Sequence, residues 1–99
     1  MVEIYQYYDY HKYLYDVYEE RKKSDLHFSF RYIGQKTGID PGYLVKVLQG
    51  KKNLALGIVP KFAEILKLDA RRREYFELLI LFSKAKSNQE IKHYFEKLL

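Results

Sequence analysis

The chain has 99 residues, enough for one hydrophobic core, and 47% of them are hydrophobic while 31% are charged. This composition is too apolar for a disordered chain, and no apolar run approaches the roughly 20 residues that a membrane-spanning helix needs. The sequence contains no cysteine, which excludes disulfides, thiolate metal sites and a cysteine nucleophile. It begins without a basic segment followed by an apolar one, so we expect no signal peptide and a cytoplasmic protein.

The net charge of +5 is unevenly distributed along the chain. Residues 1–20 contain one lysine and five acidic residues, whereas residues 21–52 contain eight basic and two acidic residues. Residues 53–99 contain nine basic and six acidic residues. A strongly basic segment of this kind indicates binding to a polyanion such as nucleic acid.

The first predicted helix runs from about Asp9, a good N-cap, to about Lys23. Its apolar side chains recur at the i, i+3, i+4, i+7 spacing of one helix face. Basic residues at its end complement the negative end of the helix dipole. The apolar face comprises Tyr10, Tyr13, Leu14, Val17 and Tyr18.

Residues 30–50 have the pattern of a helix-turn-helix. Ser29 is the predicted cap of a helix that ends before Gly38, and Asp40 and Pro41 begin a second helix that ends at Gly50. Gly38 can adopt the positive φ that a tight turn between helices requires.

Small and apolar residues at fixed positions support this interpretation. Gly34 allows the two helices to approach closely, and Ile39 fills the turn. Leu44, Val47 and Leu48 form the inner face of the second helix and leave its opposite face free.

Three further helices are predicted after residue 50. The first covers about Gly57 to Lys67 with Pro60 in its first turn, and the second runs from Asp69 to about Phe82. Ser87 to Glu90 form a capping box for the last, whose predicted apolar face is Ile91, Tyr94, Phe95 and Leu98. We therefore expect residues 1–99 to form one all-α domain, a compact bundle of about six helices. It contains a helix-turn-helix at about 30–50 and a C-terminal helical extension at about 69–99.

The segment 30–50 resembles the Cro/repressor-type helix-turn-helix, which tends to have a glycine and basic residues after the second helix, as in residues 50–53. Over nearly its whole length, the chain is also similar to a large bacterial paralogous family of predicted regulators. The matching blocks are Tyr8-Asp9-Tyr10-His11-Lys12-Tyr13-Leu14, Phe28-Ser29-Phe30-Arg31, Pro41-Gly42-Tyr43-Leu44, Gly50-Lys51-Lys52-Asn53-Leu54, Glu74-Tyr75-Phe76 and Ala85-Lys86.

This resemblance implies a transcriptional regulator in which a DNA-binding N-terminal domain is joined to a C-terminal domain of unknown function. The C-terminal domain of the same longer protein is then one expected partner. Three positions depart from the family pattern: His11 and Lys52 stand where Arg is expected, and Asp40 stands where Ser is commoner.

The free face of the second helix gives the expected contacts with double-stranded DNA. If this helix enters the major groove, we expect base contacts from Gly42, Tyr43, Lys46 and Gln49. Phosphate contacts are expected from Arg31, Lys36, Lys51, Lys52 and Asn53. The alternative is a helical protein-interaction or oligomerisation module without DNA binding, because few of these side chains can make bidentate base contacts.

Other residues do not form a pattern typical of an enzyme. His11, His27 and His93 are scattered and read as surface histidines, so no metal site or cofactor is expected. Ser29 is better explained as a cap than as a nucleophile. We expect the protein not to be an enzyme.

The tyrosines outside the core stripe and the three consecutive arginines each allow more than one interpretation. The 11 tyrosines include residues 5, 7, 8 and 15 off the core stripe, which we expect to pack the N-terminal arm onto the bundle, with a partner surface as the alternative. Arg71, Arg72 and Arg73 begin a helix against its dipole, and we expect them to pair with Asp16, Glu19 and Glu20, with phosphate contact as the alternative. The rest of the same helix, residues 75–82, is apolar almost all round. Such a helix must be covered on several sides, which suggests a homodimer.

Overall fold

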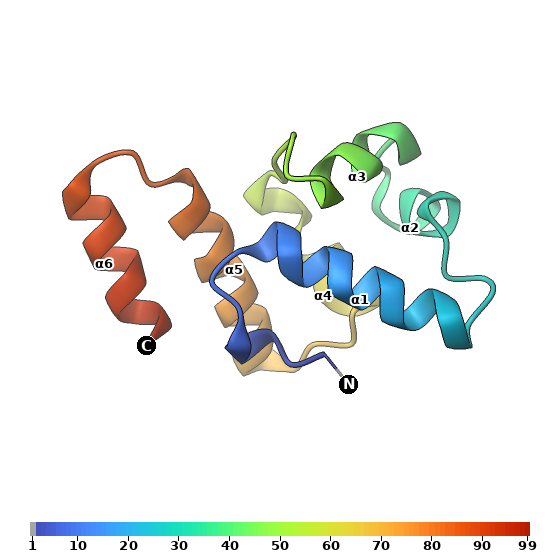
Figure 1. Ribbon diagram of the computed structural model, residues 1–99, viewed down its shortest axis with the longest axis horizontal. Coiled ribbons are helices and arrows are strands. Elements are labelled where there is room, and N and C mark those ends of the chain that lie inside the picture. The colour runs from blue at the N-terminus through green and yellow to red at the C-terminus, as the bar shows by residue number, and fades with distance from the viewer. Residues whose placement is uncertain (1) are drawn as a thin grey trace.

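The computed structural model describes residues 2–99 and confirms the all-helical prediction. Within that range the chain has six α-helices, two short 3-10 helices and no strand (Figure 1). No helix in this range combines the length and apolar character required to cross a bilayer. The elements are η1 (Ile4–Gln6), α1 (Tyr10–Ser24), α2 (Phe30–Thr37), α3 (Pro41–Leu48), η2 (Leu56–Ile58), α4 (Val59–Ile65), α5 (Ala70–Lys84) and α6 (Asn88–Leu98).

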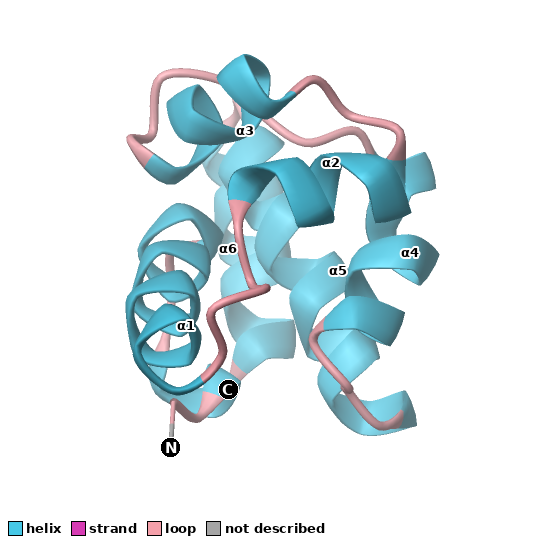
Figure 2. Ribbon diagram, turned by 90° about the vertical axis from the view of Figure 1, so that its right-hand side faces the viewer, coloured by secondary structure: helices cyan, strands magenta, loops and turns pink. Residues whose placement is uncertain are grey.

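The helices form a bundle with α3 and α6 at its periphery. In Figure 1, α1 crosses the face of the molecule, α3 lies above it, and α6 stands at the far end beside α5. Viewed from the α2 end, α1 lies on one side, α4 on the other, and α3 above (Figure 2). The outer side of α3 therefore faces away from the bundle.

Aromatic packing on α5 forms the centre of the core. The ring of Phe76 is fully buried, and its centroid lies 6.4 Å from that of Tyr10, 6.3 Å from that of Tyr13 and 6.3 Å from that of Phe62. Leu79 and Ile80 of the same helix are also fully buried. The helix is covered by α1, α4 and α6 together, as its apolar character requires.

The fourth predicted helix is shorter than its sequence pattern suggested. The segment expected to be helical from Gly57 begins as η2, and α4 proper starts at Val59 with a proline in its first turn. It ends at Ile65, because Lys67 adopts a left-handed conformation with φ of 57°.

The N-terminal segment packs onto the bundle through its tyrosines. Ile4 is 1% exposed, and the ring of Tyr5 meets that of Tyr75 edge-on at 5.1 Å. The Tyr75 hydroxyl donates to the carbonyl of Tyr7 at 2.6 Å. Burial, together with a hydrogen bond to Asp16, raises the pKa of Tyr7 to about 12. The packing role expected for these tyrosines is confirmed for residues 5 and 7.

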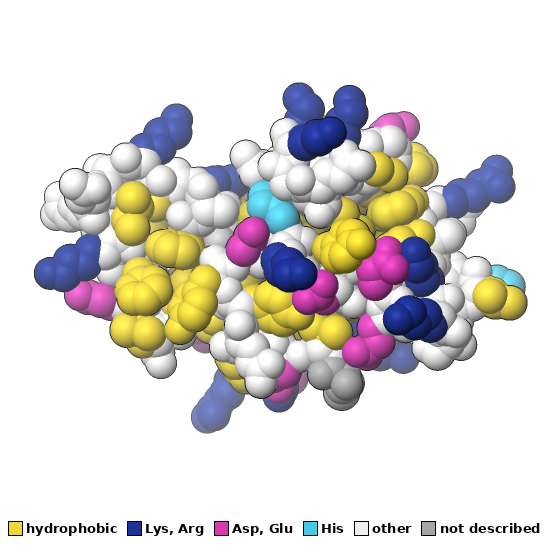
Figure 3. Space-filling view, in the orientation of Figure 1, with side chains coloured by type: hydrophobic (Ala, Val, Ile, Leu, Met, Phe, Trp, Pro, Cys, Tyr) yellow, Lys and Arg dark blue, Asp and Glu magenta, His cyan; other side chains and the backbone are white. Residues whose placement is uncertain are grey.

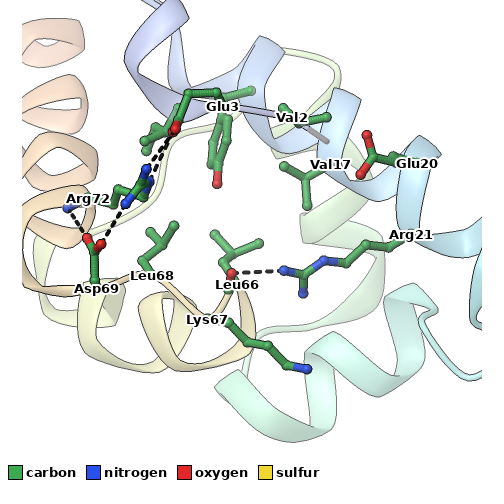
Figure 4. A pocket seen from close by; sticks show the side chains of 12 residues that line it. Val2, Glu3, Val17, Glu20, Arg21, Leu66, Lys67, Leu68, Asp69 and Arg72 are labelled. Carbon is green, nitrogen blue, oxygen red and sulfur yellow. Dashed lines mark hydrogen bonds and ion pairs between the residues drawn. The ribbon is translucent and has the colours of Figure 1, made fainter.

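Arg72, in the first turn of α5, links this N-terminal segment to α5 through hydrogen bonds and ion pairs. Its guanidinium donates to Glu3 at 2.8 and 3.0 Å and to Asp69 at 2.5 Å (Figure 4). The expected pairing of Arg72 with acidic residues of α1 is wrong, because Asp16 pairs with Lys12, and Glu19 pairs with Lys22, on their own helix. Neighbouring side chains of one helix reach each other more readily than partners on another element.

The last helix packs less completely than its pattern predicts. The capping box at Ser87 and Glu90 is present as expected. On the predicted apolar face only Leu98 is buried, while Ile91 is 41% and Phe95 40% exposed. Phe95 contacts the rings of Tyr8 and Phe82, with centroids 5.5 and 6.0 Å away. Helix α6 thus leaves apolar surface open beside α5.

Replacing Arg72 with Gln should lower the urea midpoint of unfolding at neutral pH. It should also make that midpoint fall less as the pH is lowered. Hydrogen bonds from the Arg72 side chain lower the pKa of Glu3 from 4.5, and the backbone N–H and side chain of Arg72 lower that of Asp69 from 3.8. Carboxyls whose pKa is depressed in the folded state stabilise it above their ordinary pKa, and this stabilisation is lost as the pH falls through the folded values.

The difference between wild type and Arg72→Gln should therefore be largest near neutral pH and shrink below 4.5 and then 3.8. Arg73→Gln is the matched control, because Arg73 is exposed and makes no ion pair within the described range. An equal difference at neutral and at acidic pH would contradict the assignment of Arg72 as the partner that stabilises the ionised Glu3 and Asp69.

Candidate nucleic-acid interface

The helix-turn-helix order predicted for residues 30–50 is present, and local chemistry fixes its limits. The Ser29 hydroxyl accepts the N–H of Tyr32 at 3.1 Å and begins α2. Gly38 ends this helix with φ of 78°. The Asp40 carboxylate then accepts the N–H of Tyr43 at 3.1 Å and begins α3. Each limit was predictable from the residue type at that position.

Gly34 is the point where α2 meets the turn most closely. A Cβ atom at this position would lie 2.7 Å from the carbonyl oxygen of Ile39 and 3.3 Å from the ring of Pro41. The buried hydroxyl of Thr37 donates to the Ile33 carbonyl at 2.8 Å and accepts the N–H of Ile39 at 3.3 Å. These contacts set the direction in which α3 leaves the turn.

Helix α3 has one buried face and one exposed face. Leu44 and Val47 are 1% and 0% exposed and seat the helix on the bundle. All four predicted base-contacting residues are exposed on the remaining surface of α3 and its C-cap: Gly42, Tyr43, Lys46 and Gln49. The structure therefore brings the predicted set together on the outward side of the bundle.

The end of α3 is shaped so that basic residues follow it directly. Gly50 has φ of 78°, and its N–H donates to the backbone carbonyl of Val47 at 3.0 Å. The N–H of Lys51 donates to the backbone carbonyl of Lys46 at 2.9 Å. These two bonds form a Schellman motif, which turns the chain sharply at a helix end. Lys51 and Lys52 are exposed beyond it, and Lys and Arg side chains gather over α3 in Figure 3.

The predicted DNA-contacting cations are not neutralised by neighbours. All five are exposed, and none forms an ion pair with another residue between 2 and 99: Arg31, Lys36, Lys46, Lys51 and Lys52. Arg31 lies in the first turn of α2, whereas Lys36 lies beside the turn that leads to α3. The Lys36 ammonium lies 5.7 Å from the ring centre of Tyr32.

Several other cations have structural partners. Lys12 and Lys22 pair with acidic residues of α1, and Arg72 holds Glu3. The Arg21 guanidinium donates to the carbonyls of Ile65 and Leu66 at 2.7 and 2.8 Å, where it caps the end of α4. Figure 4 shows Arg21 on one side of a cavity of about 310 Å³, opposite Arg72. Lys12, Arg21 and Lys22 of α1 thus have structural partners, whereas Lys46 of α3 forms no ion pair within residues 2–99.

Asn53 has a structural role that the sequence did not reveal. Its side-chain oxygen accepts the hydroxyl of Tyr10 at 3.3 Å, and its backbone carbonyl accepts the hydroxyl of Tyr43 at 2.6 Å. The Tyr10 hydroxyl in turn accepts the N–H of Leu54 at 2.9 Å. The residue predicted to touch a phosphate is therefore also the one that fixes the segment after α3.

His11 completes this network and is half-buried, contrary to the expectation of a surface histidine. Its Nδ1 lies 2.7 Å from the carbonyl oxygen of Val47, and its Nε2 lies 3.2 Å from Oδ1 of Asn53. The partners are 36 and 42 residues away, so no local spacing marks them. The sequence placed the adjacent Tyr10 on the core stripe of the first helix but did not indicate that this helix meets α3 here.

Within residues 2–99, no group of three or more His, Asp or Glu side chains is arranged to hold a metal ion. Comparison with models of known protein families, with curated proteins and with solved structures found no match. The geometry and charge of the α2–α3 surface are therefore what indicates a function.

Replacing Gly34 with Ala should destabilise the fold by about 1–3 kcal/mol, because the new methyl group meets a backbone carbonyl that cannot move without shifting α3. Gly57→Ala is the matched control, since a Cβ there meets nothing within 4 Å. Its effect should stay within about 0.5 kcal/mol. Urea denaturation followed by circular dichroism measures both, and equal stabilities of the two variants would show that the close approach is not required.

Replacing Tyr10 with Phe should cost about 1–3 kcal/mol, because it leaves the buried N–H of Leu54 without an acceptor. Tyr15→Phe removes a hydroxyl from a residue that is 46% exposed and should be nearly neutral. Thermal unfolding of both variants checks this. A Tyr10→Phe protein as stable as Tyr15→Phe would argue against the hydrogen bonds assigned to the segment after α3.

Proposed function

We propose that this chain is the DNA-binding domain of a bacterial transcriptional regulator, and that α3 enters the major groove of double-stranded DNA. The observation that carries the proposal is the outward face of α3. It is exposed, it follows a tight helix-helix turn, and it leads into two exposed lysines without ion pairs between residues 2 and 99. The proposal agrees with the resemblance to Cro/repressor-type domains.

The residues of α3 suit a groove lined by base edges. The major groove is about 12 Å wide and admits one α-helix. Lys46 can donate to guanine oxygen and nitrogen acceptors, and Gln49 can form paired hydrogen bonds with adenine. The Tyr43 hydroxyl is engaged with Asn53, so its exposed ring is the part available to a thymine methyl group. Gly42 allows close approach of the backbone.

The residues around α3 suit the phosphate backbone. Lys51, Lys52 and Asn53 follow the helix directly, and Lys36 precedes the turn. Exposed cations without ion pairs in the described range can release counterions from DNA without first breaking an internal bond. The charge of Asp40 is partly compensated, because its carboxylate accepts an N–H at the positive end of α3. This function needs no catalytic residue, and we assign Ser29 the role of a cap.

A second candidate function is a protein-interaction or oligomerisation module. Its support is the open apolar surface of α6 and the N-terminal segment, where Tyr8 is 49%, Ile91 41% and Phe95 40% exposed. This surface is also what a homodimer or a C-terminal domain of the same longer protein would cover. Under this alternative, duplex DNA does not bind, and sedimentation shows self-association.

Single lysine substitutions test the proposal. Lys51→Ala should weaken binding to all duplexes and reduce the slope of log affinity against log salt by about 1, because one phosphate contact is lost. Lys46→Ala should cost about 1–3 kcal/mol and relax the preference for one base. Lys92→Ala on α6 is the matched control and should bind like wild type.

The measurement is selection of bound fragments from a random duplex pool at two salt concentrations, followed by fluorescence anisotropy with the selected duplex. If Lys92→Ala weakened binding as much as Lys51→Ala, the surface around α3 would not be the interface. Failure of the wild-type protein to bind any duplex would leave the second candidate function.

A further inference from the structure

The hydrogen bonds that His11 makes depend on which of its ring nitrogens carry protons. A carbonyl oxygen only accepts hydrogen bonds, so the 2.7 Å contact with Val47 requires a proton on Nδ1. Nε2 lies 3.2 Å from Oδ1 of Asn53, and this oxygen is also only an acceptor. Both contacts are hydrogen bonds only when both ring nitrogens carry protons, that is, when His11 is an imidazolium cation.

The state of His11 decides which end of the Asn53 amide faces outward. When Oδ1 accepts from His11 and Tyr10, the amide NH₂ makes no hydrogen bond within residues 2–99. An NH₂ group is a donor and can bind a phosphate oxygen. When Nε2 loses its proton, two acceptors face each other. Rotation of the amide by half a turn relieves this by placing NH₂ against Nε2, and it also removes Oδ1 as the acceptor of the Tyr10 hydroxyl. The carbonyl oxygen then points outward and repels a phosphate.

We propose that His11 is a positioning residue of the DNA-binding surface, and that its protonation turns the amide of Asn53 toward a backbone phosphate. The inference rests on the proposed function and adds a regulation of the same surface. His11 is well placed for this, because the carbonyl of Val47 belongs to the C-terminal turn of α3, where a positive charge is favoured. The same carbonyl also accepts the N–H of Gly50 at 3.0 Å, so the ring is tied to the end of the helix.

The other charged groups on these elements do not pair with the imidazole. The Asp9 carboxylate accepts the backbone N–H of His11 at 2.9 Å. The His11 ring forms no ion pair with a residue in the described range. The Tyr10 ring lies 4.0 Å from the His11 ring, between centroids. The charged or titratable groups within two residues of His11, Val47 and Asn53, or bonded to Asn53, are Asp9, Tyr10, Lys12, Tyr13, Tyr43, Lys46, Lys51 and Lys52, and Asp40 caps the opposite end of α3.

The consequence is that duplex binding is tighter at acidic pH and weakens as the pH rises and Nε2 deprotonates. Loss of one phosphate hydrogen bond and one nearby positive charge should lower affinity about tenfold between about pH 5.5 and about pH 8.

The test measures the dissociation constant of random-sequence duplexes of about 20 base pairs at fixed ionic strength from about pH 5.5 to about pH 8. Wild type should lose about tenfold in affinity, whereas His11→Gln and Asn53→Ala should each show little dependence on pH. His27→Gln and His93→Gln, which change histidines elsewhere, should behave like wild type. In the free protein, the nitrogen resonances of His11 and the NH₂ resonances of Asn53 should shift with one common midpoint.

The outcomes separate this inference from the proposed function. Duplex binding that is independent of pH, or a dependence that persists in His11→Gln, overturns the inference and leaves the proposed function intact. A dependence that persists in Asn53→Ala reduces the effect to charge alone and overturns the role of the amide. Absence of duplex binding at every pH overturns both.

Discussion

The seating of α3 on α1 is the contact on which the rest of the structure depends. The buried side of this contact is apolar, with Tyr10 and Val47 both at 0% exposure. Its edge near the C-terminal end of α3 is polar, because Tyr10 and His11 contact the side chain of Asn53 and His11 contacts the carbonyl of Val47. Apolar burial supplies most of the stability, while the hydrogen bonds at the edge determine direction and register. Both parts act on the same short helix and set the direction of its outward face.

The same division of roles runs through the molecule. Arg21 on α1 and Arg72 on α5 are engaged with carbonyls and with carboxylates, and they join elements that are distant in the sequence. Cations on α3 and directly after it make no ion pair within the described part of the chain. A protein that binds DNA benefits from this arrangement, since an ion pair that must be broken would offset the gain from counterion release. The partly open face of α6 lies at the other end of the molecule, beyond α5 (Figure 1).

Features set by local chemistry were predictable from the sequence, and features set by distant contacts were not. Ser29, Asp40 and Ser87 cap helices where predicted, because a cap needs only the residue and the N–H groups that follow it. Helical spacing also identified which side of α3 is exposed. The contact of His11 with Asn53 spans 42 residues and that of Arg72 with Glu3 spans 69, so no local pattern could reveal either. Spacing likewise identified the apolar side of α6 but not how much of it the bundle covers.

The outward face of α3 and the segment after it form the proposed DNA-binding surface. The most direct measurement is a titration of ¹⁵N-labelled protein with random duplex DNA at low salt, followed by the backbone amide resonances. If this surface binds DNA, amides between Gly42 and Asn53 shift or broaden first, while those of α6 stay unchanged. Changes confined to α6 and the N-terminal segment, or no changes at all, would contradict it.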